Sequence, residues 1–212
     1  VLTIKGTSIV KSVKFKHHHY IGDPINAVRV INKKKVDELV FLDIQASIEK
    51  RSPNNEIIQK IADESNMPFG YGGGVRNLIH IRDVLRYGAD KVIINTGGVL
   101  NLDFVKSASD EFGASTIVAS VDVKKDMFGR YRVYTHGGRN KTSYEPHTIC
   151  QMLEHAGVGE IIVNSIDRDG TMEGYDTDLI RLVSSHSSIP IVALGGAGSV
   201  KDLKRAIAKG MA

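Results

Sequence analysis

The chain has 212 residues, a formal net charge of +4, 42% hydrophobic residues and a single cysteine, Cys150. One cysteine excludes an internal disulfide and favours a reducing, cytoplasmic location, and no apolar run reaches the roughly 18 residues that a membrane span needs. Lysine and arginine are spread along the chain without a basic tail, so we expect neither a nucleic-acid nor a membrane partner, and the positive charge suits a small anionic substrate.

Short apolar runs alternate with amphipathic segments along the chain. In chain order, strands are expected at residues 38–44, 91–96, 116–123, 160–166 and 190–194, and helices at residues 55–65, 80–88 and 200–210. Continuous strands rich in valine and isoleucine are typical of a parallel sheet covered on both faces. Alternating β and α units then leave two architectures, an open doubly wound sheet or a closed eight-stranded barrel.

The sequence also repeats itself at a spacing of 122 residues. This spacing carries Gly73-Gly74 to Gly195-Gly196, Glu38 to Glu160, Pro68 to Pro190 and Gly88 to Gly210. Two equal halves favour the barrel. We predict one α/β domain over residues 1–212, a (βα)8 TIM barrel with halves at about 1–113 and 114–212. The second half ends where its last strand should begin, so we expect the eighth strand and last helix to be lacking.

The paired glycines are candidates for phosphate binding. Gly74 and Gly196 follow expected strands, and in such barrels the loops after the strands carry the site. Glycine lets backbone N–H groups surround an anion, and a following helix N-terminus adds a favourable dipole. Each half could therefore hold one phosphate of a substrate with two. The alternative is that the glycines only form tight turns.

Longer motifs resemble a known family. "DELVFLDIQAS", "YGGGVRN", "ADKVIINT", "VYTHGGR", "SIDRDGTMEGYD" and "LGGAG" together resemble the cyclase subunit of imidazole glycerol phosphate synthase (HisF). The resemblance implies a twofold-repeated barrel that takes ammonia from a glutaminase partner in a heterodimer. It implies that the ammonia is added to a bisphosphorylated ribulosyl aminoimidazole carboxamide, with no metal or other cofactor.

The same resemblance implies roles for particular residues. Asp122 would be a catalytic acid–base group, Lys11 would approach the substrate from a mobile loop after the first strand, and Asp43 would border the pocket. One phosphate would lie on Gly74, Asn95 and Thr96, and the other on Asp169, Gly170 and Gly196. His136, near the fifth-strand loop, has either a substrate contact or a structural turn role.

One departure from the family pattern bears on catalysis. The family's second catalytic aspartate ends the first strand, where this chain has Thr3, while Leu194 and Asn164 replace small hydroxyl residues. Threonine has no proton that titrates near neutral pH, so it cannot replace a general acid or base. The pattern resembles a paralogous branch associated with surface-polysaccharide or sugar amidation. A genuine cyclase of histidine biosynthesis and a non-catalytic scaffold subunit are the alternatives.

Three expected strands begin with a charged residue: Glu38, Lys91 and Glu160. Strand alternation puts Glu38 in phase with Val40 and Leu42, so the three charges could form a ring at the N-terminal mouth of the barrel. In the resembling family this ring gates the entry of ammonia, and Asp90 would help to dock the glutaminase there. The alternative is that the charges simply face solvent.

The three adjacent histidines His17–His19 do not predict a metal site. Consecutive residues point in different directions, whereas zinc needs three or four converging ligands. We expect an exposed loop here. Cys150 is expected to be an ordinary packed residue.

Overall fold

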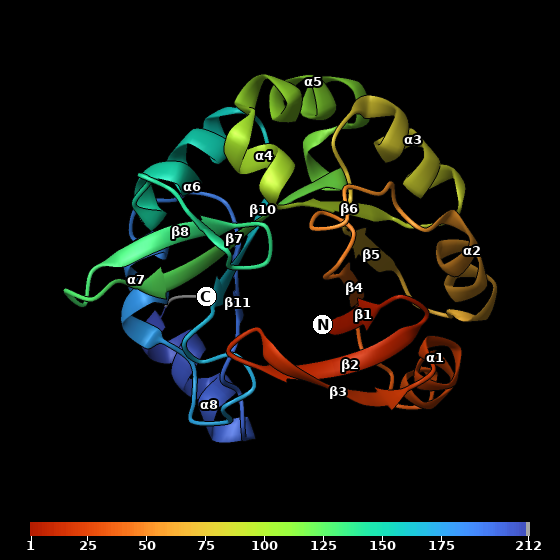
Figure 1. Ribbon diagram of the computed structural model, residues 1–212, viewed down its shortest axis with the longest axis horizontal. Coiled ribbons are helices and arrows are strands. Elements are labelled where there is room, and N and C mark those ends of the chain that lie inside the picture. Colours follow the sequence, from red (N-terminus) through yellow and green to blue (C-terminus); the bar gives the residue numbers. More distant parts are fainter. Residues whose placement is uncertain (211–212) are drawn as a thin grey trace.

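The computed structural model describes residues 1–210 and shows a parallel sheet that curls around a central axis (Figure 1). Within those residues, seven parallel strands run in the spatial order β1 (Leu2–Lys5), β4 (Leu39–Asp43), β5 (Phe69–Gly72), β6 (Lys91–Ile94), β7 (Ile117–Lys125), β10 (Glu160–Ser165) and β11 (Ile191–Leu194). The strands β1 and β11 are the two edges of this parallel series. The predicted α/β barrel architecture is confirmed, while the last two residues of its predicted second half lie outside the described chain.

Helices form an outer ring around the sheet (Figure 1). They are α1 (Pro24–Asn32), α2 (Asn55–Glu64), α3 (Leu78–Arg86), α4 (Thr96–Leu100), α5 (Leu102–Phe112), α6 (Pro146–His155), α7 (Thr177–Ser184) and α8 (Val200–Arg205). A 3-10 turn covers Ala114–Thr116. The helix expected at residues 200–210 is divided, because α8 passes into a π turn at Ala206–Gly210.

Helix α2 illustrates how the sequence sets these elements. The Asn54 side chain accepts a hydrogen bond from the Ile57 N–H and so caps the helix N-terminus. Ile57, Ile58 and Ile61 are buried, which places one apolar face against the sheet. The main hydrophobic core lies between the sheet and the helices and includes Ile4, Phe41 and Tyr71.

The strand register repeats between the two halves. Leu39 pairs with Phe69, and 122 residues further on Ile161 pairs with Ile191. Thr3 lies opposite Leu42, and Asp122 lies opposite Asn164. Asn164 follows Leu42 by the same 122 residues, so the two pairs correspond. Thr3 and Asp122 therefore occupy equivalent places in the two halves.

A second, smaller apolar cluster fills the inside of the sheet. It contains Ile93, Val118 and Ile162, with Val40, Leu42 and Leu194 packed against them. Residues alternate along each strand, so Asn95, Ser120 and Asn164 point to the same inner side one layer further on. An apolar interior layer thus lies beneath a polar layer at the carboxyl ends of the strands.

Each half adds antiparallel strands to its first parallel strand. In the first half these are β2 (Ser8–Val13) and β3 (Lys16–Gly22), and in the second half β8 (Tyr131–Thr135) and β9 (Asn140–Lys141). The prediction of loops at Lys11 and at His17–His19 is wrong. Lys11 lies on β2 opposite His19 on β3, because backbone pairing orders this segment, and these side chains are exposed.

Candidate functional site at the carboxyl ends of the strands

Asp122 lies at the centre of the polar layer. It is 7% exposed, and each of its carboxylate oxygens accepts one amide hydrogen bond. Asn95 Nδ2 donates to Oδ2 at 3.0 Å, and Asn164 Nδ2 donates to Oδ1 at 3.3 Å. The strands β7 and β10 and the residue that follows β6 thus bring the three side chains to one point.

The burial of Asp122 changes its acidity. Removal from water raises its pKa to about 7, although the amide donors of Asn95 and Asn164 oppose this, and the charge of Asp169 adds to the rise. A carboxyl group that titrates near neutral pH can both take and give a proton. Asp122 therefore has the acidity that general acid–base chemistry requires.

Thr3 is the residue of β1 that corresponds to Asp122. Its hydroxyl donates a hydrogen bond to the Val10 carbonyl oxygen on β2. This bond stays within the β1–β2 hairpin and engages the one proton that the side chain could offer. Asp122 therefore has no carboxyl counterpart at the equivalent position of the first half.

Asp43 is held in a network of its own. The carboxylate is 4% exposed and accepts two bonds from Arg51, from Nη1 at 2.7 Å and Nη2 at 2.9 Å. The N–H groups of Gln45 and Ala46 also donate to it. Burial and the Asp43 charge together raise the pKa of Tyr71, which donates to the same carboxylate. The structure therefore gives Asp43 a role in ordering the loop after β4, and its contact with substrate stays a prediction.

The two glycine loops both place their glycines at positive φ. Gly74 has φ +75° and Gly196 has φ +100°, a region that favours glycine. A side chain at Gly74 would approach the Arg51 carbonyl oxygen to 2.5 Å, and one at Gly196 would collide with the Gly174 carbonyl oxygen. Both glycines are therefore required by the turns themselves, and their phosphate binding stays a prediction.

The loop after β10 lies against the β2–β3 hairpin. Ser12 Oγ donates to Asp169 Oδ2 at 2.9 Å, and the Lys14 N–H donates to the Asp169 carbonyl oxygen at 2.9 Å. Burial raises the pKa of Asp169, against the donors Ser12 and the Phe15 backbone. A side chain at Gly170 would overlap the Ser12 carbonyl oxygen. The hairpin is thus docked on the segment predicted to bind the second phosphate.

Thr96 links two further loops. Its hydroxyl oxygen accepts a hydrogen bond from the His136 N–H at 3.0 Å, and its hydroxyl donates to Asn95 Oδ1 at 3.2 Å. Asn95 and Thr96 are therefore adjacent to Asp122 and to the loop after β8. Among the predicted site residues, Lys11 lies on β2 with its side chain exposed.

Glu38, Lys91 and Glu160 meet at the opposite end of the apolar interior. Lys91 Nζ lies 2.8 Å from Glu38 Oε2 and 3.0 Å from Glu160 Oε2. Burial disfavours the Lys91 charge, but the two carboxylates outweigh it and raise its pKa. The predicted charged cluster is therefore formed, and we call it the charged triad below.

The whole chain, residues 1–212, matches a family described as histidine biosynthesis protein. It is 44% identical over 202 residues to a Pseudomonas aeruginosa protein provisionally named imidazole glycerol phosphate synthase subunit hisF2, covering 95% of this chain and 80% of that protein. It is also 39% identical to imidazole glycerol phosphate synthase subunit HisF of Alkaliphilus metalliredigens, covering 100% of this chain and 84% of that protein.

The chain belongs to the HisF family. A Leptospira interrogans protein with a provisional HisF name is 41% identical and is covered over 82% of its length. In this HisF chain, sequence reasoning missed Arg51 and Ser12, which anchor Asp43 and Asp169. Neither belongs to the motifs that carry the resemblance, so only the three-dimensional contacts identify them.

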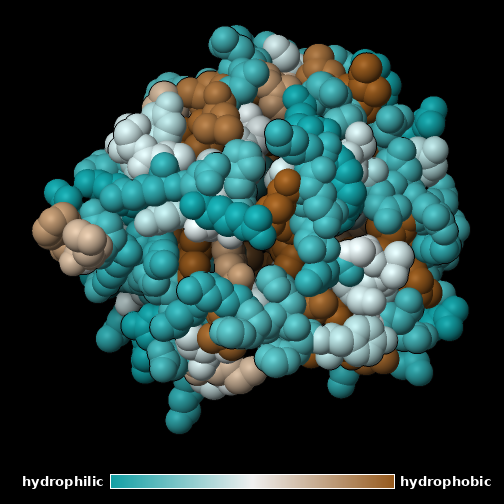
Figure 2. Space-filling view, viewed as in Figure 1, coloured by the Kyte–Doolittle hydropathy of each residue, from teal (hydrophilic) through white to brown (hydrophobic). Residues whose placement is uncertain are grey.

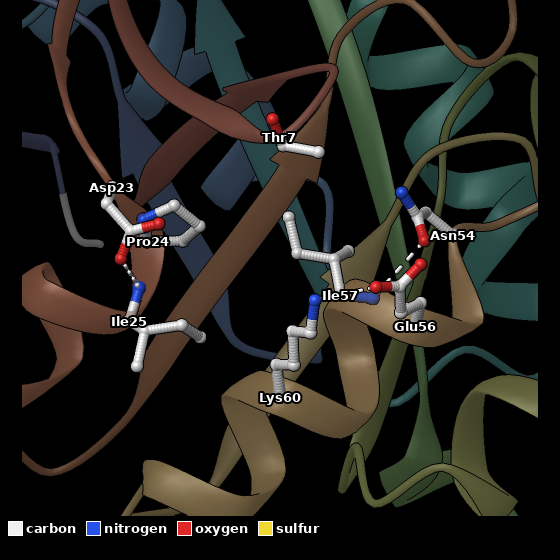
Figure 3. A pocket seen from close by; sticks show the side chains of 8 residues that line it. All are labelled: Thr7, Asp23, Pro24, Ile25, Asn54, Glu56, Ile57 and Lys60. Carbon is white, nitrogen blue, oxygen red and sulfur yellow. Dashed lines mark hydrogen bonds and ion pairs between the residues drawn. The ribbon is translucent and has the colours of Figure 1, made fainter.

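A small cavity of about 80 Å³ lies outside the barrel, between the N-termini of α1 and α2 (Figure 3). It is lined by Thr7, Asp23, Pro24, Ile25, Asn54, Glu56, Ile57 and Lys60. Four of its polar side chains are already engaged, because Asp23 and Asn54 cap the helices and Lys60 pairs with Glu56 at 2.6 Å. None of the predicted site residues lines it, so it is separate from the candidate site.

Within residues 1–210, histidine, cysteine, aspartate and glutamate side chains form no group of three that could hold a metal ion. Among the same residues, the helices are too short or too polar to cross a membrane. Cys150 is buried, and burial raises the pKa of its thiol to about 12. Its thiol is therefore protonated and unreactive at neutral pH.

Proposed function

We propose that this chain is a HisF-like synthase subunit that receives ammonia from a glutaminase and delivers it through the barrel. The ammonia would enter at the charged triad and pass the apolar interior layer. It would emerge beside a phosphorylated small molecule bound at Asn95, Thr96, Asp169 and the loops of Gly74 and Gly196.

The observation that carries the proposal is the contrast between the two ends of the barrel. The charged triad is complete, with both ion pairs formed. At the other end, Asp122 has no carboxyl counterpart, because Thr3 occupies the equivalent position and its hydroxyl donates a hydrogen bond to the Val10 carbonyl oxygen. Loss of one positioned acid–base group typically lowers a rate by about 10²–10⁴. We infer that ammonia handling is kept while cyclisation is weakened, so that the ammonia serves amidation of a sugar or polysaccharide precursor.

A second candidate function is the full cyclase reaction of histidine biosynthesis in the cytoplasm. The acidity of Asp122 favours it, because one carboxyl group that titrates near pH 7 can exchange protons in both directions. The similarity to proteins named as HisF subunits also supports this candidate.

Glutaminase activation tests the proposed partner. The full-length protein, mixed with the glutaminase of the same genome, is expected to accelerate glutamate formation above the rate of the glutaminase alone, as for two coupled sites. Asp90→Asn should reduce this activation, because it removes a charge near the triad while an amide oxygen can still accept from the Phe69 N–H. The matched control Asp110→Asn, in an exposed pair on α5, should leave it unchanged. No complex and no acceleration would refute the ammonia role.

A further inference from the structure

A buried side-chain oxygen next to Asp122 lacks a hydrogen-bond partner among residues 1–210. It is Oδ1 of Asn164, a residue of β10 that is 5% exposed. The nitrogen of the same carboxamide donates to Asp122 Oδ1 at 3.3 Å. Leaving a buried acceptor without a donor costs free energy, and native proteins leave few such groups. The unpaired oxygen therefore points to a second arrangement in which it has a donor.

This oxygen is closed off from solvent. The face of the molecule in Figure 2 is hollowed near its centre, but Asn164 Oδ1 is buried, and a Cβ atom placed on Gly195 would lie 3.2 Å from it. The oxygen thus lies against the glycine loop after β11, so its donor has to come from the protein itself. A protonated Asp122 can be that donor, because its carboxyl group already contacts the same carboxamide.

Asn95 binds the other oxygen of Asp122 but is fixed in its orientation. Its Nδ2 donates to Asp122 Oδ2 and to the Ser120 carbonyl oxygen, each at 3.0 Å, and its Oδ1 accepts from the Thr96 hydroxyl at 3.2 Å. Turning this carboxamide over would break all three bonds. Among residues 1–210, the Asn164 carboxamide has the single bond to Asp122. Asn164 can therefore turn over without losing any other hydrogen bond.

The two protonation states of Asp122 require opposite partners. An ionised carboxylate only accepts hydrogen bonds, so it needs the amide nitrogen, whereas a protonated carboxyl group donates through its O–H and needs the amide oxygen. Half a turn of the Asn164 carboxamide exchanges the two. The charged side chain that acts on Asp122 is Asp169, and the neighbours Asn95, Ser120 and Asn164 are uncharged. Burial, with a smaller effect of Asp169, raises the pKa of Asp122 to about 7, so both states are populated at neutral pH.

We propose that the Asn164 carboxamide turns over whenever Asp122 gains or loses a proton, so that Asn164 is a positioning residue that keeps this carboxyl group hydrogen-bonded in both states. The inference rests on the proposed function for the acid–base role of Asp122, while the turning itself requires no substrate. A residue without both a donor and an acceptor would leave Asp122 Oδ1 unpaired in one state or the other. Asn95 holds the carboxyl group in place, and Asn164 adapts to its proton.

NMR of the full-length protein, labelled at asparagine, aspartate and glycine, tests this between about pH 5 and about pH 9. Below the midpoint of the Asp122 titration, the Nδ2 protons of Asn164 should face Gly195 and show a strong nuclear Overhauser contact with its Hα protons. Above the midpoint this contact should weaken several-fold, and the Asn164 carboxamide resonances should move with the same midpoint as the Asp122 carboxyl carbon. Asn95 is the matched control, because it binds the same carboxyl group and should keep its contacts at every pH.

Two variants identify the group that drives the turning. Asp122→Asn should abolish the response of Asn164 to pH, and Asp169→Asn, which removes the neighbouring charge, should lower the midpoints of Asp122 and Asn164 together. An Asn164–Gly195 contact of equal strength at both ends of the pH range, a midpoint that differs from that of Asp122, or a response that survives Asp122→Asn would overturn the proposal. No glutaminase or turnover is involved, so failed glutaminase activation beside an intact turning of Asn164 would count against the proposed function alone.

Discussion

The Lys91→Met variant is expected to unfold with a free energy about 1–3 kcal/mol lower than that of the unchanged protein at pH 7. The substitution leaves Glu38 and Glu160 facing one another without their shared cation. Breaking a fully buried pair costs about 3–5 kcal/mol. The triad side chains are 25%, 32% and 23% exposed, so water screens part of the repulsion.

Urea denaturation measures this difference, with Lys106→Met as the control. Lys106 pairs with Asp110 on the surface of α5, where both side chains are about two-thirds exposed, and we expect a change of about 0.5 kcal/mol or less. Equal losses in the two variants would show that the triad carries no special charge balance.

The Asp122→Asn variant is expected to be more stable than the unchanged protein at pH 8, by about 2–4 kcal/mol. Burial raises the folded-state pKa of Asp122 to about 7, above that of an unfolded aspartate. Between about pH 4 and pH 7 the folded state therefore holds the proton more tightly, and stability falls as the pH rises through this window. Asparagine does not ionise, so the variant does not lose stability in this way as the pH rises. Its advantage over the unchanged protein should therefore vanish near pH 4, where the loss has not yet begun.

The pocket can accept an asparagine at this position. One amide oxygen can keep the hydrogen bond from Asn95, and the Asn164 amide, whose Oδ1 has no partner, can turn to accept from the new amide group. Asp43→Asn is the control, because that buried carboxylate is paired with Arg51 and the variant should lose stability at pH 8. If unfolding at pH 5 and pH 8 shows no gain for Asp122→Asn, the carboxyl group is not held at raised pKa.

Much of the fold follows from the sequence because its pattern is redundant. Buried strands such as β4 and β10 read as continuous apolar runs, and the spacing of 122 residues fixes which strands correspond. The charged triad was also predictable. Glu38 and Lys91 stand at the starts of expected strands, and strand alternation puts Glu38 on the same side as Val40 and Leu42. These features depend on periodicity, which a single sequence displays directly.

Other parts of the site depend on contacts between distant segments. The salt bridge from Arg51 to Asp43 forms because the loop after β4 returns on itself, and no periodic pattern encodes it. The hairpin at Lys11 mixes apolar residues with lysines and histidines without regular alternation, and its order comes from backbone pairing and from the contact of Ser12 with Asp169. The bond between Thr3 and Val10 likewise appears only when β1 and β2 pair.

The most direct test of the weakened cyclase is turnover of the bisphosphorylated ribulosyl aminoimidazole carboxamide with excess ammonium salt, for full-length protein and for Thr3→Asp. We expect the unchanged protein to be silent or to turn over far below the roughly 1 s⁻¹ of ordinary enzymes, and Thr3→Asp to gain about 10²–10⁴-fold. Turnover of the unchanged protein at about 1 s⁻¹ or faster, with no gain in Thr3→Asp, would contradict the account and identify a working cyclase.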